Sequence, residues 1–271
     1  MYVVLFILLL IAKSHAYHTT EDLLARVENE CKHVDDLSCT WEGDMLVVDW
    51  KKYRPRDVLW TFNEHARERI TGELALAYIL RLKDIRPLRR ITIIPIVNVW
   101  GRKQVEHSEP CRRKNKNEVD TNRNYPVRRH HFPLHSQQYE GRTALSEPET
   151  QFIASLLQNH TRMFINIHSG EFSIYTAWDS SFNLPPNNEK VQANVEKWGV
   201  KCPQCVVGPA ATTSSYLAFG TAVDYATTLG VDAYTFEIYG SEHGTCERIF
   251  NPRNPQPILD MWIDILTLSL D

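Results

Sequence analysis

The residues of this sequence best suited to chemistry are histidines and glutamates that follow apolar segments. His65 and Glu68 stand three residues apart, so both side chains of one helical turn can reach a single cation. His168 follows the apolar segment 163–167 and offers a third ligand. Two histidines and one glutamate leave a fourth zinc position open for water, which is the pattern of a hydrolytic site. Glu237 ends another apolar segment and is a candidate general base.

Burial explains why these ionisable groups need a partner. The segments before Glu64, His168 and Glu237 are apolar and rich in β-branched or aromatic residues, which predicts buried strands. In an open α/β sheet the ligand site lies at the carboxyl ends of the strands. Because a buried charged group without a partner is costly, a metal ion at this edge would supply one.

Strands alternate with helices along the chain, which predicts an α/β fold. We expect a single-domain α/β/α sandwich with a mixed, mostly parallel, twisted central sheet. Residues 101–146 are basic and polar, and we interpret them as a long loop of the kind that is usually functional. The predicted strands are 45–50, 57–63, 90–99, 163–168, 172–178 and 233–238, and the predicted helices are 21–34, 67–83, 147–159, 187–198 and 257–270.

Five segments resemble the motifs of one enzyme family. Phe62–Thr71 (FNEHARERIT) is similar to the zinc signature of the metallocarboxypeptidases of the carboxypeptidase A/B type. The other four occur in the family's order and are Arg113–Asn115, Val119–Asn124, Asn166–Gly170 and Thr235–Ile238. Gly240 and Cys246–Pro252 resemble the motif flanks of plant and protist members. The sequence is therefore identified as a member of this family over roughly residues 17–270.

The resemblance implies a metal centre. His65, Glu68 and His168 would hold Zn²⁺, one ion per chain. Asp120 would accept a hydrogen bond from His65 and fix the tautomer of its imidazole. Glu237 would take a proton from the zinc-bound water and pass it to the leaving amine.

The resemblance also implies a binding site for the C-terminus of a peptide or protein. Arg113 would polarise the scissile carbonyl and stabilise the oxyanion. Asn122 and Arg123 would hold the terminal carboxylate, for which a bidentate guanidinium is well suited. Tyr216 would close over the substrate. An endoprotease has no need of such a carboxylate pocket, so the implied activity is that of an exopeptidase.

Two residues give opposite predictions for the side chain of the released residue. Val223 falls where members that prefer hydrophobic ends carry an aliphatic residue. Asp179 falls near a position where other members that prefer basic ends carry an acid, and it favours Lys or Arg if it faces the pocket. Alternatively, Asp179 is a turn residue after the strand 172–178. On balance we expect a broad or hydrophobic preference.

Other functions share parts of this pattern. A catalytically silent zinc- or peptide-binding homologue would not need both Glu237 and Arg113. A zinc deacylase or amidase of N-acyl amino acids would share the zinc and the carboxylate site. The presence of Tyr216 and of the segment 120–124 is only weak evidence against this function. A cytosolic carboxypeptidase is disfavoured by the N-terminal segment and the cysteines.

The N-terminal segment predicts secretion. The apolar run Val3–Ala12 is about half as long as a bilayer-spanning helix. Ser14 and Ala16 form a small-x-small pattern, so residues 1–16 are predicted to be a signal peptide and residues 17–271 the catalytic domain. An uncleaved anchor or a buried strand is the alternative. No later segment is apolar enough to span a membrane.

The six cysteines fit an oxidising compartment. No second CxxC accompanies the one that begins at Cys202, so a local disulfide is favoured there over a zinc or redox site. Cys31 and Cys39 are near enough to close a short loop, which leaves the remaining two cysteines to pair with each other. The predicted pairs are Cys31–Cys39, Cys111–Cys246 and Cys202–Cys205.

The charge balance argues against one class of partner. Lys and Arg number 30 and Asp and Glu number 33, which gives a formal net charge of −3. This composition gives no electrostatic case for nucleic acid, and we expect a monomer.

His130 and His131 have no matching metal partner and are interpreted as exposed loop residues. Asn159 begins a glycosylation sequon.

Overall fold

The computed structural model describes residues 17–51, 57–214 and 216–271, so the predicted signal peptide, 1–16, lies outside the described residues. The strands are β1 Leu37–Glu42, β2 Met45–Trp50, β3 Val58–Phe62, β4 Ile91–Ile94, β5 Met163–His168, β6 Phe172–Thr176, β7 Val206–Pro209 and β8 Asp232–Ile238. The helices are α1 Thr20–His33, α2 Arg69–Ile85, α3 Val99–His107, the 3₁₀ turn η1 Thr121–Arg123, α4 Pro148–Gln158, α5 Asn188–Gly199, α6 Ala210–Thr213, α7 Ala222–Thr228, α8 Cys246–Phe250 and α9 Gln256–Leu268.

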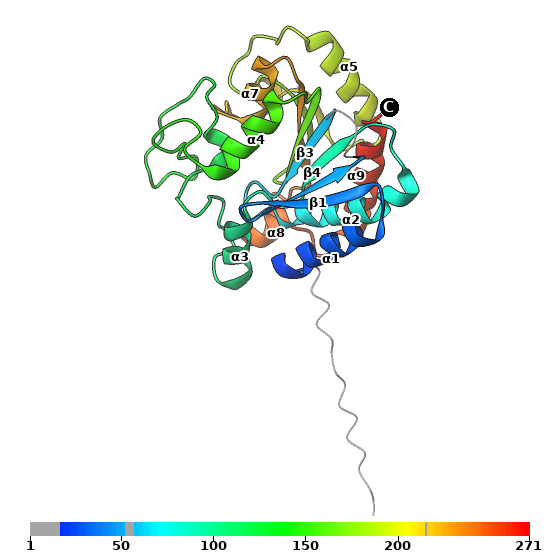
Figure 1. The fold of residues 1–271 in the computed structure, drawn as a ribbon. Helices are drawn as coiled ribbons and strands as arrows, with labels where there is room; N and C mark the ends of the chain where they lie inside the picture. The colour runs from blue at the N-terminus through cyan, green and yellow to red at the C-terminus, as the bar shows by residue number, and fades with distance from the viewer. Residues whose placement is uncertain (1–16, 52–56, 215) are drawn as a thin grey trace, which may run out of the picture.

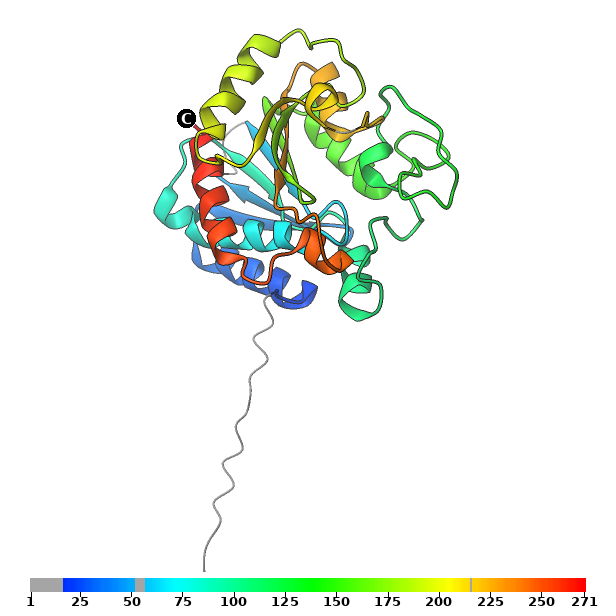
Figure 2. The ribbon, with the colours of Figure 1, turned by 180° about the vertical axis from the view of Figure 1, so that it is seen from behind.

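The described strands form one eight-stranded sheet in the order β1-β2-β4-β3-β5-β8-β6-β7. The central strands β4, β3, β5 and β8 are parallel, whereas β2 is antiparallel to β4 and β6 is antiparallel to β8. Helices α1, α2 and α9 lie on one side of the sheet, and α4 and α7 lie on the other (Figures 1 and 2). The predicted α/β/α architecture with a mixed, mostly parallel sheet is therefore confirmed.

Alternation along the central strands divides the apolar residues between two cores. On β5, Ile165 and Ile167 belong to the core that α1, α2 and α9 cover, whereas Phe164 belongs to the core beneath α4 and α7. Successive side chains of a strand point to opposite faces of the sheet. His168 therefore lies on the same face as Phe164, and Glu237 on β8 follows the same alternation.

The region after β4 differs from the prediction. The strand predicted over 90–99 ends at Ile94, because Pro95 has no N–H with which to continue the ladder. Asn98 then caps α3, since its side chain accepts a hydrogen bond from the backbone N–H of Gly101. The segment interpreted as a loop thus begins with helix α3.

Several short elements were not predicted. Strands β1 and β7 form the two edges of the sheet and are partly exposed, so neither has the apolar pattern of a buried strand. Helices α6, α7 and α8 are too short to show a clear helical period. Only α7 of these three has most of its residues buried.

The predicted disulfide pairing is confirmed. Disulfides join Cys31 to Cys39, Cys111 to Cys246 and Cys202 to Cys205. The second of these ties the segment after α3 to α8, across 135 residues of sequence. The other two bridges are local.

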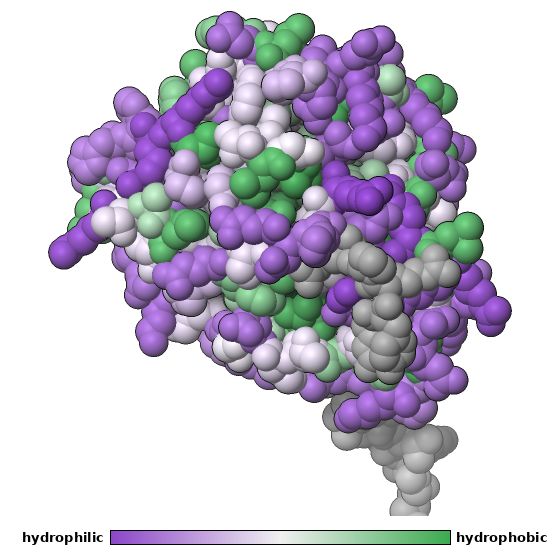
Figure 3. Space-filling model, turned by 45° about the horizontal axis from the view of Figure 1, so that its top comes forward, coloured by the Kyte–Doolittle hydropathy of each residue, from purple (hydrophilic) through white to green (hydrophobic). Residues whose placement is uncertain are grey.

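The surface of the described residues has no large apolar area on the face shown in Figure 3, where hydrophobic side chains occur in small separate groups. None of the described helices combines the length and the apolar character that crossing a membrane requires. Asn159, the sequon residue, is exposed where α4 ends.

Candidate active site

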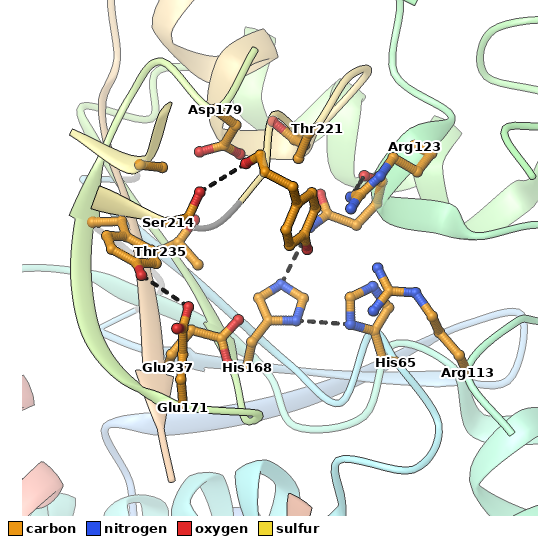
Figure 4. A pocket seen from close by; sticks show the side chains of 15 residues that line it. His65, Arg113, Arg123, His168, Glu171, Asp179, Ser214, Thr221, Thr235 and Glu237 are labelled. Atoms are coloured by element: carbon orange, nitrogen blue, oxygen red, sulfur yellow. Dashed lines mark hydrogen bonds between the residues drawn. The ribbon is translucent and has the colours of Figure 1, made fainter. Parts of the chain in front are cut away.

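Three buried side chains, His65, Glu68 and His168, converge at the carboxyl ends of β3 and β5, and Figure 4 shows the two histidines. The ligand atoms of His65, Glu68 and His168 all lie within 4.8 Å of one another. The Nδ1 atoms of the two histidines are 3.1 Å apart, and they lie 2.8 and 3.0 Å from the two carboxylate oxygens of Glu68. Ligand atoms about 2.0–2.1 Å from a tetrahedral zinc ion are about 3.3 Å apart. The donor set and its spacing therefore fit zinc.

A buried polar network shapes the loop that carries His65. Asn63 has a positive φ of 51°, a conformation that asparagine adopts more readily than most residues. Its side-chain amide donates to the carbonyls of His65 and Ala66, and its oxygen accepts from Arg102 Nη1 at 2.6 Å. Arg102 is fully buried and also pairs with Glu73. Burial lowers the pKa of Arg102 to about 10, so it stays charged at neutral pH.

A charged pair orients the His65 imidazole. Asp120 Oδ1 lies 3.2 Å from His65 Nε2, and Asp120 Oδ2 accepts a hydrogen bond of 2.7 Å from Arg113 Nε. Burial opposes ionisation of Asp120, but Arg113 and Arg123 hold the pKa of this carboxyl well below its usual range. An ionised Asp120 keeps the proton of His65 on Nε2 and leaves Nδ1 free for a metal.

Glu237 stands next to the metal group. It is paired with His168 in the parallel register of β5 and β8. Burial and the carboxylate of Glu68 raise the pKa of Glu237 to about 8. One of its carboxylate oxygens, Oε2, has no hydrogen-bond partner among the described residues. A glutamate with a free oxygen next to the metal group is placed for general-base work.

One pocket joins this group to the residues predicted to bind substrate. His65, His168, Glu237 and Arg113 line it together with Asn122, Arg123, Asp179 and Tyr216. Arg123 is buried, and its Nη1 donates to the carbonyl of Asn122 at 2.7 Å. Tyr216 is 54% exposed and is therefore accessible at the pocket. A guanidinium at the opposite end from the base can receive an anionic group of a substrate.

The two candidates for side-chain preference lie in different environments. Asp179 lines the pocket, and its backbone N–H donates to Asp224 Oδ1 at 2.7 Å. Burial and the Asp224 carboxylate raise the pKa of Asp179 to about 7. Val223 is buried on α7 and packs into the core beneath α4 and α7, so it is absent from the pocket lining.

Some lining residues were missed from the sequence; they are Glu171, Tyr175, Ser214, Thr221 and Thr235. Thr235 stands two residues before Glu237 on β8, so strand alternation alone could have placed both on one face. Glu171 immediately precedes β6, and it accepts a hydrogen bond of 2.9 Å from Tyr175 Oη. Nothing in the sequence pattern marks that pair.

The other histidines singled out from the sequence lie outside the metal group. His130 and His131 are exposed, as interpreted. His131 Nδ1 lies 2.8 Å from Glu140 Oε1, and the His130 ring packs against Phe132 and Phe219.

The chain belongs to the zinc carboxypeptidase family, because the family's sequence profile matches residues 42–257. That family is zinc-dependent, which agrees with the His-Glu-His group. The comparison with curated proteins gave no match.

Solved structures share the fold at low sequence identity. Bovine thrombin-activatable fibrinolysis inhibitor, solved with a tick carboxypeptidase inhibitor, is 20% identical with a TM-score of 0.82, over 94% of this chain and 96% of that one. Carboxypeptidase A from Helicoverpa armigera is 19% identical with a TM-score of 0.79, over 93% of this chain and 73% of that one. A metallo-carboxypeptidase from Burkholderia cenocepacia is 14% identical with a TM-score of 0.62, over 93% and 69%.

Proposed function

We propose that this protein is a secreted zinc carboxypeptidase that hydrolyses the C-terminal peptide bond of peptides or proteins. The observation that carries the proposal is one pocket lined together by the metal-group histidines His65 and His168, by Glu237, and by Arg123 and Asn122. Three disulfides support passage through an oxidising compartment.

Each residue of the pocket has a distinct task in this reaction. A zinc ion held by His65, Glu68 and His168 would activate water and polarise the scissile carbonyl. Glu237 accepts the proton of the attacking water and returns it to the leaving amine. The Arg113 guanidinium, held at Nε by Asp120, stabilises the charge that develops on the carbonyl oxygen.

The carboxylate-binding end makes the enzyme an exopeptidase. Arg123 and Asn122 pair with the terminal carboxylate, so the last peptide bond is the one that reaches the metal. Tyr216 lies over the same pocket and shields the bound C-terminus from solvent. A binding module would gain nothing from a carboxylate with a free oxygen beside its metal.

The pocket lining favours basic C-terminal residues. Asp179 lines the pocket, and we propose that the side chain of the terminal residue lies beside it, whereas Val223 packs into the core. A Lys or Arg side chain would pair with the Asp179 carboxylate, whereas an aliphatic side chain would cover it without adding a hydrogen bond or a charge. We therefore propose preferential release of Lys and Arg, in contrast to the preference expected from the sequence.

Mass spectrometry of peptides tests the function. A peptide ending in a free Arg or Lys should lose its last residue, and the same peptide with an amidated C-terminus should stay intact. o-Phenanthroline should stop the release, and added Zn²⁺ should restore it. Cleavage at internal bonds, or release that continues in the chelator, would contradict the proposal.

A further inference from the structure

We propose that Glu64 is a positioning residue for the metal ligand His168, in the way that Asp120 orients His65. The inference rests on the proposed zinc site and adds a residue to it that the mechanism above does not use. Glu64 immediately precedes His65 in the chain but lies beside the other histidine of the metal group.

The carboxylate of Glu64 is deeply buried and only partly satisfied. The residue is 1% exposed. Its Oε2 accepts a hydrogen bond of 2.7 Å from Asn166 Nδ2, and Asn166 is itself fixed by Thr61 Oγ1 at 2.9 Å. Its Oε1 has no partner among the described residues. Burying a carboxylate is costly unless donors surround it, and each carboxylate oxygen can accept more than one hydrogen bond, so Oε2 has room for a second donor beside Asn166.

His168 provides such a partner at its second ring nitrogen. When Nδ1 binds a metal, Nε2 carries the proton and needs an acceptor. Asn122 Nδ2 lies 3.4 Å from Nε2, but it is a donor, because the Asn122 oxygen already accepts from the backbone N–H of Ala222 at 2.9 Å. The acceptor that faces Nε2 is Glu64 Oε2, at 3.8 Å.

The two histidines of the metal group are thus arranged alike. Each turns Nδ1 toward the shared ligand position and Nε2 toward a carboxylate, Asp120 at 3.2 Å for His65 and Glu64 at 3.8 Å for His168. The longer contact exceeds hydrogen-bond length, and we infer that it closes when a metal fixes Nδ1. Glu64 then holds the His168 ring in the orientation that binds metal.

The test measures zinc affinity, which needs no substrate. Zn²⁺ dissociation constants are measured by competition with a chelator for the wild type, Glu64→Gln and Glu64→Met. Glu64→Gln keeps an oxygen that can accept from Asn166 and His168 but removes the charge, whereas Glu64→Met removes the acceptor. Zinc affinity is expected to fall in the order wild type, Glu64→Gln, Glu64→Met, by about 10- to 100-fold for the last.

Glu147→Gln is the matched control. Glu147 lies at the start of α4, away from the metal group, and is 3% exposed. Its carboxylate accepts a hydrogen bond of 2.7 Å from the side chain of Asn115. This control should lose thermal stability yet keep the wild-type zinc affinity. The visible absorption spectrum of the cobalt-substituted protein should change in both Glu64 variants and not in the control, because it reports the ligand field and not the overall stability.

Zinc affinities of both Glu64 variants within about threefold of wild type would overturn the inference, as would an unchanged cobalt spectrum. If Glu64→Met does not fold, Glu64→Gln alone decides, since it conserves size and the bond from Asn166. Failure of the proposed function is seen separately, as a wild-type protein that binds zinc and releases no C-terminal residue.

Discussion

His168 and Glu237 occupy paired positions on the neighbouring parallel strands β5 and β8, so the sheet itself sets the distance between the last metal ligand and the proposed base. The base therefore cannot move to compensate for a shorter side chain. Glu237→Asp should lower kcat by about 100-fold or more, a typical loss for a displaced general base, while zinc content stays at one ion per chain. Steady-state kinetics together with metal analysis checks this, and near-normal kcat would argue against Glu237 as the base.

The pH dependence of selectivity follows from Asp179. Its pKa is raised to about 7 by burial and by Asp224, so the carboxyl is neutral below that pH and ionised above it. The ratio of kcat/KM for a C-terminal Arg substrate to that for a Leu substrate should therefore rise between pH 6 and 8. The Leu substrate controls for titrations that affect both reactions.

Asp224→Asn should move this rise to lower pH. The substitution removes the like charge beside Asp179 and so lowers the pKa of that carboxyl. In the wild type, the backbone N–H of Asp179 donates to Asp224. The side-chain oxygen of an asparagine at position 224 can still accept this hydrogen bond. A selectivity ratio that is constant across this pH range, or one that Asp224→Asn leaves unchanged, would exclude Asp179 as the group that recognises basic side chains.

Arg123 should contribute mainly through the substrate carboxylate. Arg123→Ala is expected to lower kcat/KM for peptides with a free C-terminus by about 100-fold, the value of one or two charge-assisted hydrogen bonds. Its bonds to the carbonyl of Asn122 and to Gln138 are local, so the thermal midpoint should change little. A large fall in the midpoint with unchanged kcat/KM would show that Arg123 only braces the loop.

The Cys111–Cys246 disulfide should affect both stability and activity. It joins the segment just before Arg113 to α8, whose Phe250 ring lies 4.2 Å from the Arg67 guanidinium in the metal-binding loop. Replacing both cysteines by serine should cost about 2–5 kcal/mol of unfolding free energy and lower kcat.

The Cys31–Cys39 disulfide is the matched control, because it joins α1 to β1 far from the pocket residues. Its replacement should lower the free energy of unfolding, measured in denaturant, and leave kcat unchanged. Equal effects of the two replacements on kcat would mean that the long-range bridge has no special role in placing Arg113.

The central strands were predictable because each carries a continuous apolar run that is buried on both faces. Val58–Phe62 is followed by Asn63, Glu64 and His65, and Met163–His168 ends at a histidine, so the parallel arrangement of these strands brings the ionisable residues to one edge. The edge strands could not be predicted in this way, since β1 and β7 are partly exposed and lack that run.

The side-chain pocket was the part least accessible to sequence reasoning. Val223 and Asp179 belong to segments that meet only in three dimensions, where Asp224 accepts the backbone N–H of Asp179. Neighbouring side chains on α7 point in different directions. A shift of one position along the helix therefore decides whether a side chain enters the core or points toward the segment that carries Asp179. Helix α7 is short, so its periodicity does not show which of its residues turns inward.

The most direct test of a zinc carboxypeptidase is the release of C-terminal residues by the wild type and by Glu237→Gln, each with its zinc content measured. Blocked dipeptides ending in Phe, Leu, Lys, Arg or Glu serve as substrates, with and without o-phenanthroline. We predict chelator-sensitive release from the wild type, fastest for Lys and Arg, and none from a folded, zinc-loaded Glu237→Gln. Absence of release from every substrate by a folded, zinc-loaded wild type would contradict the account and favour a binding protein or a deacylase.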